Sequence, residues 1–196
     1  ALIAALLNFL LTPAGTLMPL MVTRHFKGGV WHLSLLESVM GMGIVGGGLL
    51  LGVWGGFKNR VYTSLIGIAG IGLGILVFGL APENWFWLGV AGFAITGFMN
   101  PIANGPLQAI MQSKIAPEMQ GRVLSLINSL CMMMMPIALL IAAPMAELLG
   151  LRVWYWAGGL LVILVALLTF FVPAVITLDK NNPSIQAAAE PETSLV

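Results

Sequence analysis

The segment LSLLESVMGMGIVGGGLLLG, Leu33 to Gly52, decides the fold class of this protein. It is almost wholly apolar, and a helix of this length spans a hydrocarbon core of about 30 Å. The rest of the chain has the same character, because 59% of the 196 residues are hydrophobic and only 8% are charged. Soluble domains have about 25% charged residues. The composition excludes a soluble globular domain and predicts that this segment is a membrane helix.

Similar apolar segments recur along the chain at about 1–22, 30–56, 61–81, 84–111, 121–146 and 151–178. They lack the period-two alternation of a membrane barrel, and a helix satisfies all of its own backbone groups within lipid. The pattern predicts an all-α membrane protein, a bundle of six transmembrane helices. Residues 179–196 are polar without apolar periodicity, so we expect a disordered tail.

Lys and Arg residues indicate the orientation of these helices, because cytoplasmic loops are enriched in both. Six crossings place both ends of the chain on the same side of the membrane. Five basic residues lie on that side: Lys58, Arg60, Lys114, Arg122 and Lys180. Three lie on the other side: Arg24, Lys27 and Arg152. The pattern predicts a multi-pass protein of the cell (inner) membrane with a cytoplasmic tail. The chain begins within its first apolar segment, and we expect it to be part of a longer protein.

Glycines recur at four-residue spacing in the second and third apolar segments. The sets are Gly48, Gly52 and Gly56; Gly43 and Gly47; Gly70 and Gly74. Small residues at this spacing let helix backbones approach closely in lipid. We therefore interpret the glycines as seams between helices.

Prolines and polar side chains coincide in the first and fourth segments. Thr12-Pro13-x-x-Thr16 in the first resembles Asn100-Pro101-x-x-Asn104 in the fourth. Such an echo suggests two three-helix repeats, and proline-interrupted helices at corresponding places indicate a transporter's binding site. The candidate cavity residues are Asn8, Thr12, Thr16, Asn100, Asn104 and Gln108. The alternative is that these side chains join helices by interhelical hydrogen bonds.

Glu37 is a single carboxylate about one third of the way into the second segment. A charge inside a membrane helix costs about 3 kcal/mol on insertion scales, and an apolar environment favours the neutral, protonated carboxyl group. Glu37 is therefore a candidate for proton coupling or for binding a cationic substrate group. The alternative is a structural glutamate that faces water or contacts His32 or Arg24.

Other function classes lack the residues they need. His25 and His32 lie near one loop, Cys131 is remote, and carboxylates do not pair at helical spacing, so we predict no enzyme, no metal site and no cofactor. The net charge of +1 gives no electrostatic footprint for nucleic acid.

Three motifs resemble the C-terminal half of the major facilitator superfamily, most closely its proton-driven drug exporters of the macrolide-efflux type. They are GVWGGFKNR (Gly52 to Arg60), PEMQGRVLSL (Pro117 to Leu126) and the run through Leu36 and Glu37. The first is similar to the family's cytoplasmic loop motif, with Gly52, Gly56, Lys58 and Arg60 at motif positions and Gly56 where the family usually has Asp. The resemblance covers residues 1–178.

The resemblance implies that the six segments are helices seven to twelve of a twelve-helix fold, arranged as two inverted three-helix repeats. It implies alternating access around a central site that helices seven and ten line. We expect half of a secondary transporter that exports amphipathic drugs or metabolites in exchange for protons. Its partners would be the lipid bilayer and either an N-terminal six-helix half or a second copy in a homodimer. The alternative is a six-helix self-associating or accessory membrane protein that does not transport on its own.

Overall fold

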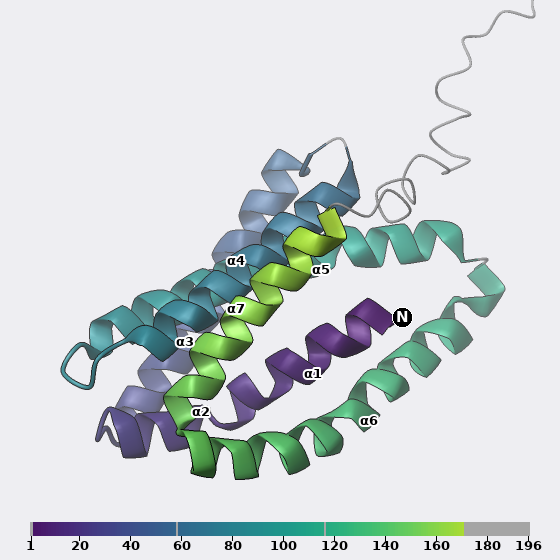
Figure 1. The fold of residues 1–196 in the computed structure, drawn as a ribbon. Helices are drawn as coiled ribbons and strands as arrows, with labels where there is room; N and C mark the ends of the chain where they lie inside the picture. Colours follow the sequence, from purple (N-terminus) through teal and green to yellow (C-terminus); the bar gives the residue numbers. More distant parts are fainter. Residues whose placement is uncertain (1, 58, 116, 171–196) are drawn as a thin grey trace, which may run out of the picture.

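The computed structural model describes residues 2–57, 59–115 and 117–170, and these residues form helices without any strand (Figure 1). The all-α prediction is confirmed. The elements are α1 (Leu2–Thr16), α2 (Met18–Leu20), the π-helical turn η1 (Met21–His25), α3 (Val30–Trp54), α4 (Arg60–Leu80), α5 (Phe86–Lys114), α6 (Pro117–Leu149) and α7 (Leu151–Phe170). The predicted tail, 179–196, lies outside the described residues.

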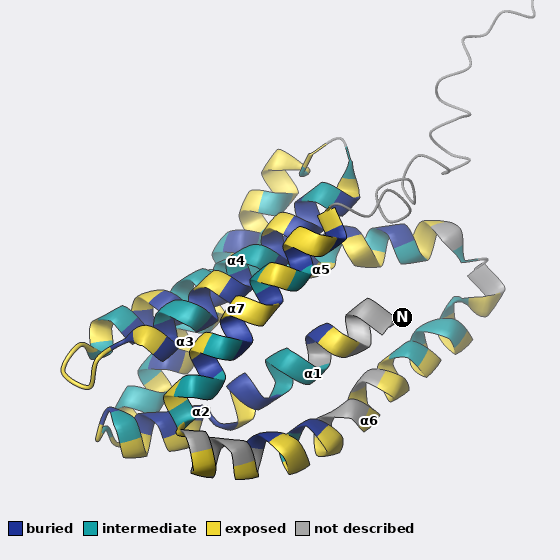
Figure 2. Cartoon of the chain, viewed as in Figure 1, coloured by how far each residue is buried: buried dark blue, intermediate teal, exposed yellow. Residues whose placement is uncertain are grey.

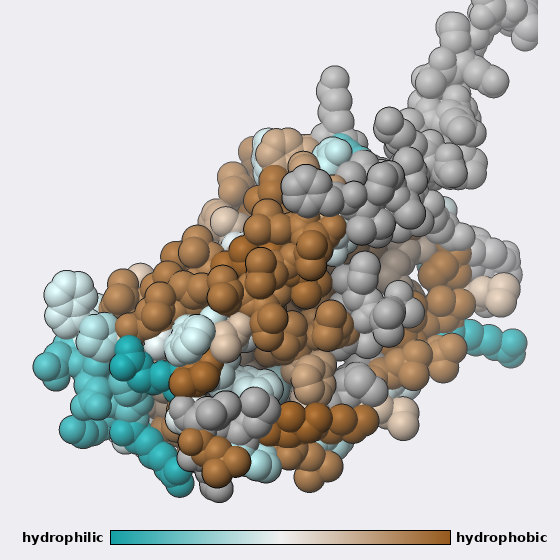
Figure 3. Space-filling view, viewed as in Figure 1, coloured by the Kyte–Doolittle hydropathy of each residue, from teal (hydrophilic) through white to brown (hydrophobic). Residues whose placement is uncertain are grey.

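Four helices in the described part of the chain are long and apolar enough to cross a membrane: α3, α4, α5 and α7. The face of the molecule drawn in Figure 3 fits this, because hydrophobic atoms cover most of its described helical surface. Hydrophilic atoms gather at the lower left end, where η1 leads to α3 and α4 leads to α5. There Lys27 Nζ lies 3.2 Å from Glu83 Oε2. The chain is a multi-pass membrane protein.

The first apolar segment, predicted as a proline-interrupted helix over about 1–22, is interrupted in the structure as well. It breaks at Leu17, between α1 and α2, and continues as η1 to His25. Pro19 has no N–H to donate to the carbonyl of Gly15, so the helical ladder is interrupted here. The hydroxyl of Tyr155 on α7 donates to the carbonyl of Ala14 at 2.6 Å, which gives the broken helix a partner from outside.

Local backbone chemistry explains where the other helices begin and end. α6 begins at Pro117 rather than near residue 121, because proline is favoured at the first position of a helix. α3 ends at Trp54, because the next residue, Gly55, has a φ of 73°, a left-handed conformation that suits glycine. α4 begins after Asn59, whose side-chain oxygen accepts from the N–H of Val61 at 3.0 Å.

Glycine seams hold the helices that meet around α4, which packs along both α5 and α7, while α3 packs on α5. A Cβ added at Gly43 would lie 2.8 Å from the backbone N of Phe98, and one at Gly47 would overlap the carbonyl oxygen of Phe98. A Cβ at Gly70 would lie 2.5 Å from the side chain of Met99. The seams predicted for the Gly43/Gly47 and Gly70/Gly74 pairs are confirmed, since Gly74 likewise abuts the backbone of α5.

The third predicted glycine seam, at Gly48 and Gly52, has no partner helix among the described residues. No atom of the described chain lies within 4 Å of a Cβ built on Gly48 or Gly52, so this face of α3 has no helix against it. Gly56 lies in the turn after α3 at φ 82°, beside Thr63. The reason is angular: Gly48 follows Gly47 by about 100° around the helix, so the two glycine sets face different directions.

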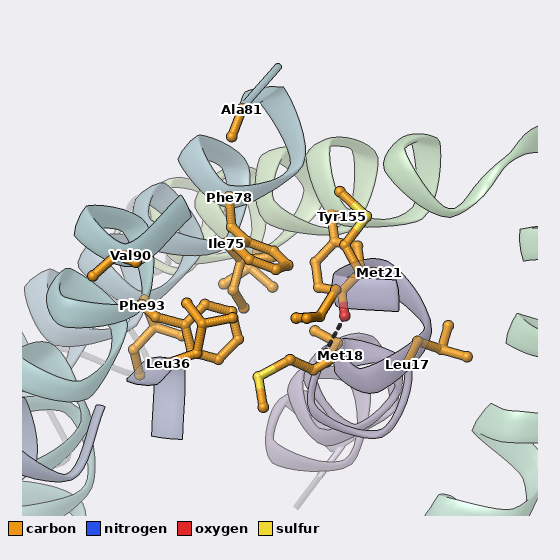
Figure 4. Packing of buried hydrophobic residues seen from close by; sticks show 14 of the residues in the cluster. Leu17, Met18, Met21, Leu36, Ile75, Phe78, Ala81, Val90, Phe93 and Tyr155 are labelled. Atoms are coloured by element: carbon orange, nitrogen blue, oxygen red, sulfur yellow. Dashed lines mark hydrogen bonds between the residues drawn. The ribbon is translucent and has the colours of Figure 1, made fainter. Parts of the chain in front are cut away.

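Phe78 on α4 is the centre of the hydrophobic core (Figure 4). Its ring centroid lies 4.6 Å from that of Phe93 on α5, 4.9 Å from that of Tyr155 on α7 and 5.7 Å from that of Phe26. Buried residues concentrate where α4, α5 and α7 meet, whereas much of α6 is exposed as it curves beside α1 (Figure 2). The four-helix packing of α3, α4, α5 and α7 is therefore tight, and α1 and α6 border it.

Candidate functional site

A cavity of about 410 Å³ lies among α1, α4 and α5, with one side chain of α3 in its wall. This volume is within the usual range of small-molecule pockets, about 300–1,000 Å³. Its polar lining consists of Thr12 on α1 and Thr96, Asn100 and Asn104 on α5. Its apolar lining includes Leu7 and Leu11 of α1, Met40 of α3, Ile68, Ile71 and Ile75 of α4, and Phe93 and Leu107 of α5.

The polar side chains on α5 follow one face because they recur every four residues. The Thr96 hydroxyl donates to the Gly92 carbonyl at 3.0 Å. The Asn104 amide N–H donates to the backbone carbonyl of Asn100 at 3.1 Å and approaches the side-chain oxygen of Asn100 at 3.4 Å. These bonds within one helix orient the side chains and leave their remaining donors and acceptors for a bound molecule.

Two prolines leave backbone carbonyl groups of the same helix without their usual N–H donors. Pro101 and Pro106 lie inside α5 and lack the N–H groups that would bond the carbonyls four residues earlier, those of Gly97 and Ile102. Ile102 directly precedes the cavity residue Ala103. The helix that carries the cavity amides is therefore also the one with an interrupted hydrogen-bond ladder.

The composition of the cavity limits what it can bind. Most of its wall is aliphatic or aromatic, and its polar groups are amides and hydroxyls without a fixed charge. Such a lining fits a largely apolar molecule with a few hydrogen-bonding groups. Among the described residues there is no group of three His, Cys, Asp or Glu side chains that could hold a metal ion.

The structure brings together three of the six predicted cavity residues: Thr12, Asn100 and Asn104. Thr16 is exposed, and its hydroxyl donates to the carbonyl of Thr12 at 3.0 Å. Gln108 is exposed and is not among the residues that line the cavity. The side chain of Asn8 lies outside what the structure describes.

The apolar wall of the cavity was not predicted from the sequence. Ile68, Ile71 and Ile75 recur at three- and four-residue spacing and share one face of α4. Their spacing was a visible signal, but it predicts a buried helix face equally well whether a cavity or a neighbouring helix covers it.

Glu37 lies on an exposed face of α3 and does not line the cavity. Met40 on the same helix does, and a step of three residues turns the helix direction by about 60°. Ser34 and Gly41 are exposed beside Glu37. The contacts proposed with His32 or Arg24 do not occur in the described structure: the His32 ring instead accepts from the Gly29 N–H at 3.3 Å.

The loop motif lies at the opposite end of the bundle from the Lys27–Glu83 pair. Gly52 is in the last turns of α3, Gly56 is in the turn that follows, and Arg60 begins α4. The N–H of Phe57 donates to the hydroxyl of Thr63 at 2.9 Å, which ties the turn to α4. Lys58 lies outside the described residues.

No protein-family profile matches the chain. It is 33% identical over 178 residues to macrolide efflux protein A from Streptococcus pyogenes, a match that covers 91% of this chain and 44% of that protein. It is 36% identical over 138 residues to macrolide efflux protein A from Enterococcus faecalis, covering 70% of this chain and 43% of that protein. It is 29% identical over 150 residues to the multidrug efflux pump Tap from Mycolicibacterium fortuitum, a match that covers 76% of this chain and 36% of that protein.

The chain thus spans less than half the length of the curated relatives it matches. Over most of its own length, this multi-pass membrane chain is similar to part of known drug efflux proteins.

Proposed function

We propose that this chain is one half of a secondary active exporter of amphipathic compounds. The observation that carries the proposal is the cavity that brings Thr12 of the broken α1 together with Asn100 and Asn104 of the proline-containing α5. Similarity to proteins named for macrolide and multidrug efflux supports export as the function, and transport rather than catalysis. The cavity lining supports an amphipathic substrate.

The packing of the helices supports two inverted three-helix repeats. In that arrangement α1, α3 and α4 correspond to α5, α6 and α7. If the two repeats are exchanged, the contact between α1 and α6 corresponds to the contact between α5 and α3, and the contact between α4 and α7 corresponds to itself. The helices of all three pairs pack together. We infer a six-helix bundle, half of a twelve-helix major facilitator fold, whose two halves rock to expose the cavity to either side of the membrane in turn.

A half needs a complement, and α3 offers a surface for one. Gly48 and Gly52 face open space, and Glu37 is exposed on the same helix. Small residues on an open helix face allow another helix to approach closely in lipid. The complement is either an N-terminal six-helix half or a second copy of this chain. Glu37 would face this complement and exchange protons at the interface. The tail and the loop motif would lie on the cytoplasmic side of the membrane.

Reconstitution in proteoliposomes tests the proposal. A pH gradient is imposed, and both binding and efflux of a fluorescent amphipathic cation are followed for the wild type, for Asn100→Ala/Asn104→Ala, and for Gln112→Ala as the matched control on the exposed side of α5. We expect the double variant to bind about 10- to 1,000-fold more weakly, from two lost hydrogen bonds of about 0.6–2 kcal/mol each. The control should bind like the wild type.

Three results separate the alternatives. Gradient-driven efflux by the chain alone supports a homodimer. Binding that depends on Asn100 and Asn104 without efflux supports a half that needs the other half. Equal binding by wild type and double variant refutes the cavity as the substrate site and favours an accessory or self-associating membrane protein.

A further inference from the structure

A second cavity, of about 570 Å³, lies at the end of the bundle where η1, α4 and α7 meet. It is separate from the cavity among α1, α4 and α5 and shares none of its residues. Its basic side chains are Arg24 and His25 from η1 and Arg152 from the first turn of α7, and its apolar side chains include Leu80, Leu151 and Trp156.

Two of the basic side chains are fixed by the end of α4. Arg152 donates from Nε to the carbonyl of Gly79 at 3.3 Å and from Nη2 to the carbonyl of Leu80 at 3.1 Å. The Nε2 atom of His25 lies 3.0 Å from the carbonyl oxygen of Ala81. The last carbonyl groups of a helix attract basic side chains. Binding to the end of α4 therefore explains the positions of Arg152 and His25, but it does not explain why Arg24 lines the same cavity.

Arg24 adds a second guanidinium group to the same cavity. Its side chain is exposed, and the structure gives it no hydrogen bond or ion pair to the described residues. The one described carboxylate near this end, Glu83, pairs with Lys27 at 3.2 Å. Glu147 lies three residues before Gly150 along the chain, and its side chain is outside the described structure. Two guanidinium groups therefore line one cavity whose described walls contain no carboxylate.

We propose that this cavity binds the phosphate group of an anionic phospholipid. Guanidinium groups bind phosphate oxygens through paired, charge-assisted hydrogen bonds. The rim is suited to acyl chains, because Leu80 is 52% exposed and Trp156 is 39% exposed beside the arginines. Trp residues favour the boundary between lipid and water, where guanidinium groups meet the phosphates of lipid headgroups. The site is independent of the proposed transport cavity.

Native mass spectrometry of the chain released from mixed phosphatidylglycerol and phosphatidylcholine bilayers tests the site. The wild type should retain phosphatidylglycerol in preference to phosphatidylcholine. Arg24→Gln should reduce that preference about tenfold, because it removes the charge-assisted hydrogen bonds of one guanidinium group. Arg24→Lys should give an intermediate loss, because lysine keeps the charge but lacks the fork geometry. Arg24 is the better target because Arg152 also holds the end of α4.

Lys27→Gln is the matched control, since it removes the same charge from the same end but outside the cavity lining. An equal loss for Lys27→Gln and Arg24→Gln would show general attraction to an anionic surface and overturn the proposal. So would a wild type that retains no phosphatidylglycerol.

Soluble glycerol phosphate separates the lipid from a free phosphate. If it displaces the retained lipid only at concentrations far above those of the lipid, the acyl chains contribute and the lipid assignment stands. If it binds the chain in neutral detergent with the same dependence on Arg24 and displaces the lipid readily, the site takes a soluble phosphate and the lipid assignment is wrong.

Discussion

Replacing Tyr155 with phenylalanine tests how much one hydrogen bond from α7 adds to the packing that holds the broken first segment. The Tyr155 side chain is fully buried, and its hydroxyl donates to the carbonyl of Ala14 at 2.6 Å. The ring also packs edge-on against Phe78, with centroids 4.9 Å apart. The phenylalanine variant keeps this ring contact and removes only the hydroxyl, so any effect reports the link between α7 and α1.

The magnitude follows from the environment of that bond. A hydrogen bond between membrane helices contributes about 0.6 kcal/mol on average and up to about 1.7 kcal/mol, and a buried carbonyl left without a donor adds a penalty. We expect a loss of about 1–2 kcal/mol in the free energy of unfolding, which lowers the folded-to-unfolded ratio about 5- to 30-fold. For a chain of this size the melting temperature should fall by about 2–4 °C per kcal/mol.

The assay is unfolding in mixed micelles by titration with SDS, followed by circular dichroism, together with amide hydrogen exchange. Tyr62→Phe is the control, because it makes the same chemical change at a half-buried ring that lies 5.3 Å from Phe170. Its effect should stay within about 0.5 kcal/mol. Exchange should accelerate in Tyr155→Phe at Met18–Leu20, next to the break. Equal unfolding free energies for the two variants, with unchanged exchange, would refute the role given to this bond.

Three further substitutions separate features that look alike in the sequence. Gly47→Ala should destabilise the protein by about 1–3 kcal/mol, since the new methyl group meets the carbonyl of Phe98; an unaffected unfolding midpoint would contradict the α3–α5 seam. Gly48→Ala, one residue later, should be neutral or stabilising by up to about 1 kcal/mol, because the site is open and alanine favours helix. Glu37→Gln should leave folding unchanged and flatten the pH dependence of transport; full pH dependence in this variant would assign Glu37 a structural role.

The helices could be predicted from the sequence because lipid imposes a strong rule: a backbone within it must satisfy its own hydrogen bonds. Long apolar segments therefore have to be helical, and the described residues are. The break at Leu17 could also have been predicted, since Pro19 removes a donor that the ladder needs. The start of α6 at Pro117, before the apolar segment that begins near residue 121, could also have been predicted, because proline is favoured at the first helical position.

The directions in which side chains face could not be predicted in the same way. Gly43 and Gly47 have the same spacing as Gly48 and Gly52, yet the first pair meets α5 and the second meets no described atom. Spacing shows that residues share a face, but the partner of that face depends on how whole helices pack. Glu37 illustrates the same point, because its exposure depends on which neighbour α3 receives.

The two sides of the candidate transport cavity are held by different kinds of contact. On the α5 side, backbone packs directly on backbone: a Cβ at Gly74 would lie 2.5 Å from the carbonyl oxygen of Gly92. On the α1 side, the wall that carries Thr12 belongs to a segment interrupted at Leu17 and joined to α7 by the Tyr155 hydroxyl. Close backbone packing resists displacement, because movement by a fraction of an ångström loses many contacts at once, whereas α1 packs on α6 and α7 rather than along α4 or α5. We therefore expect the α1 wall to move when a substrate enters, with α4 and α5 as the fixed wall.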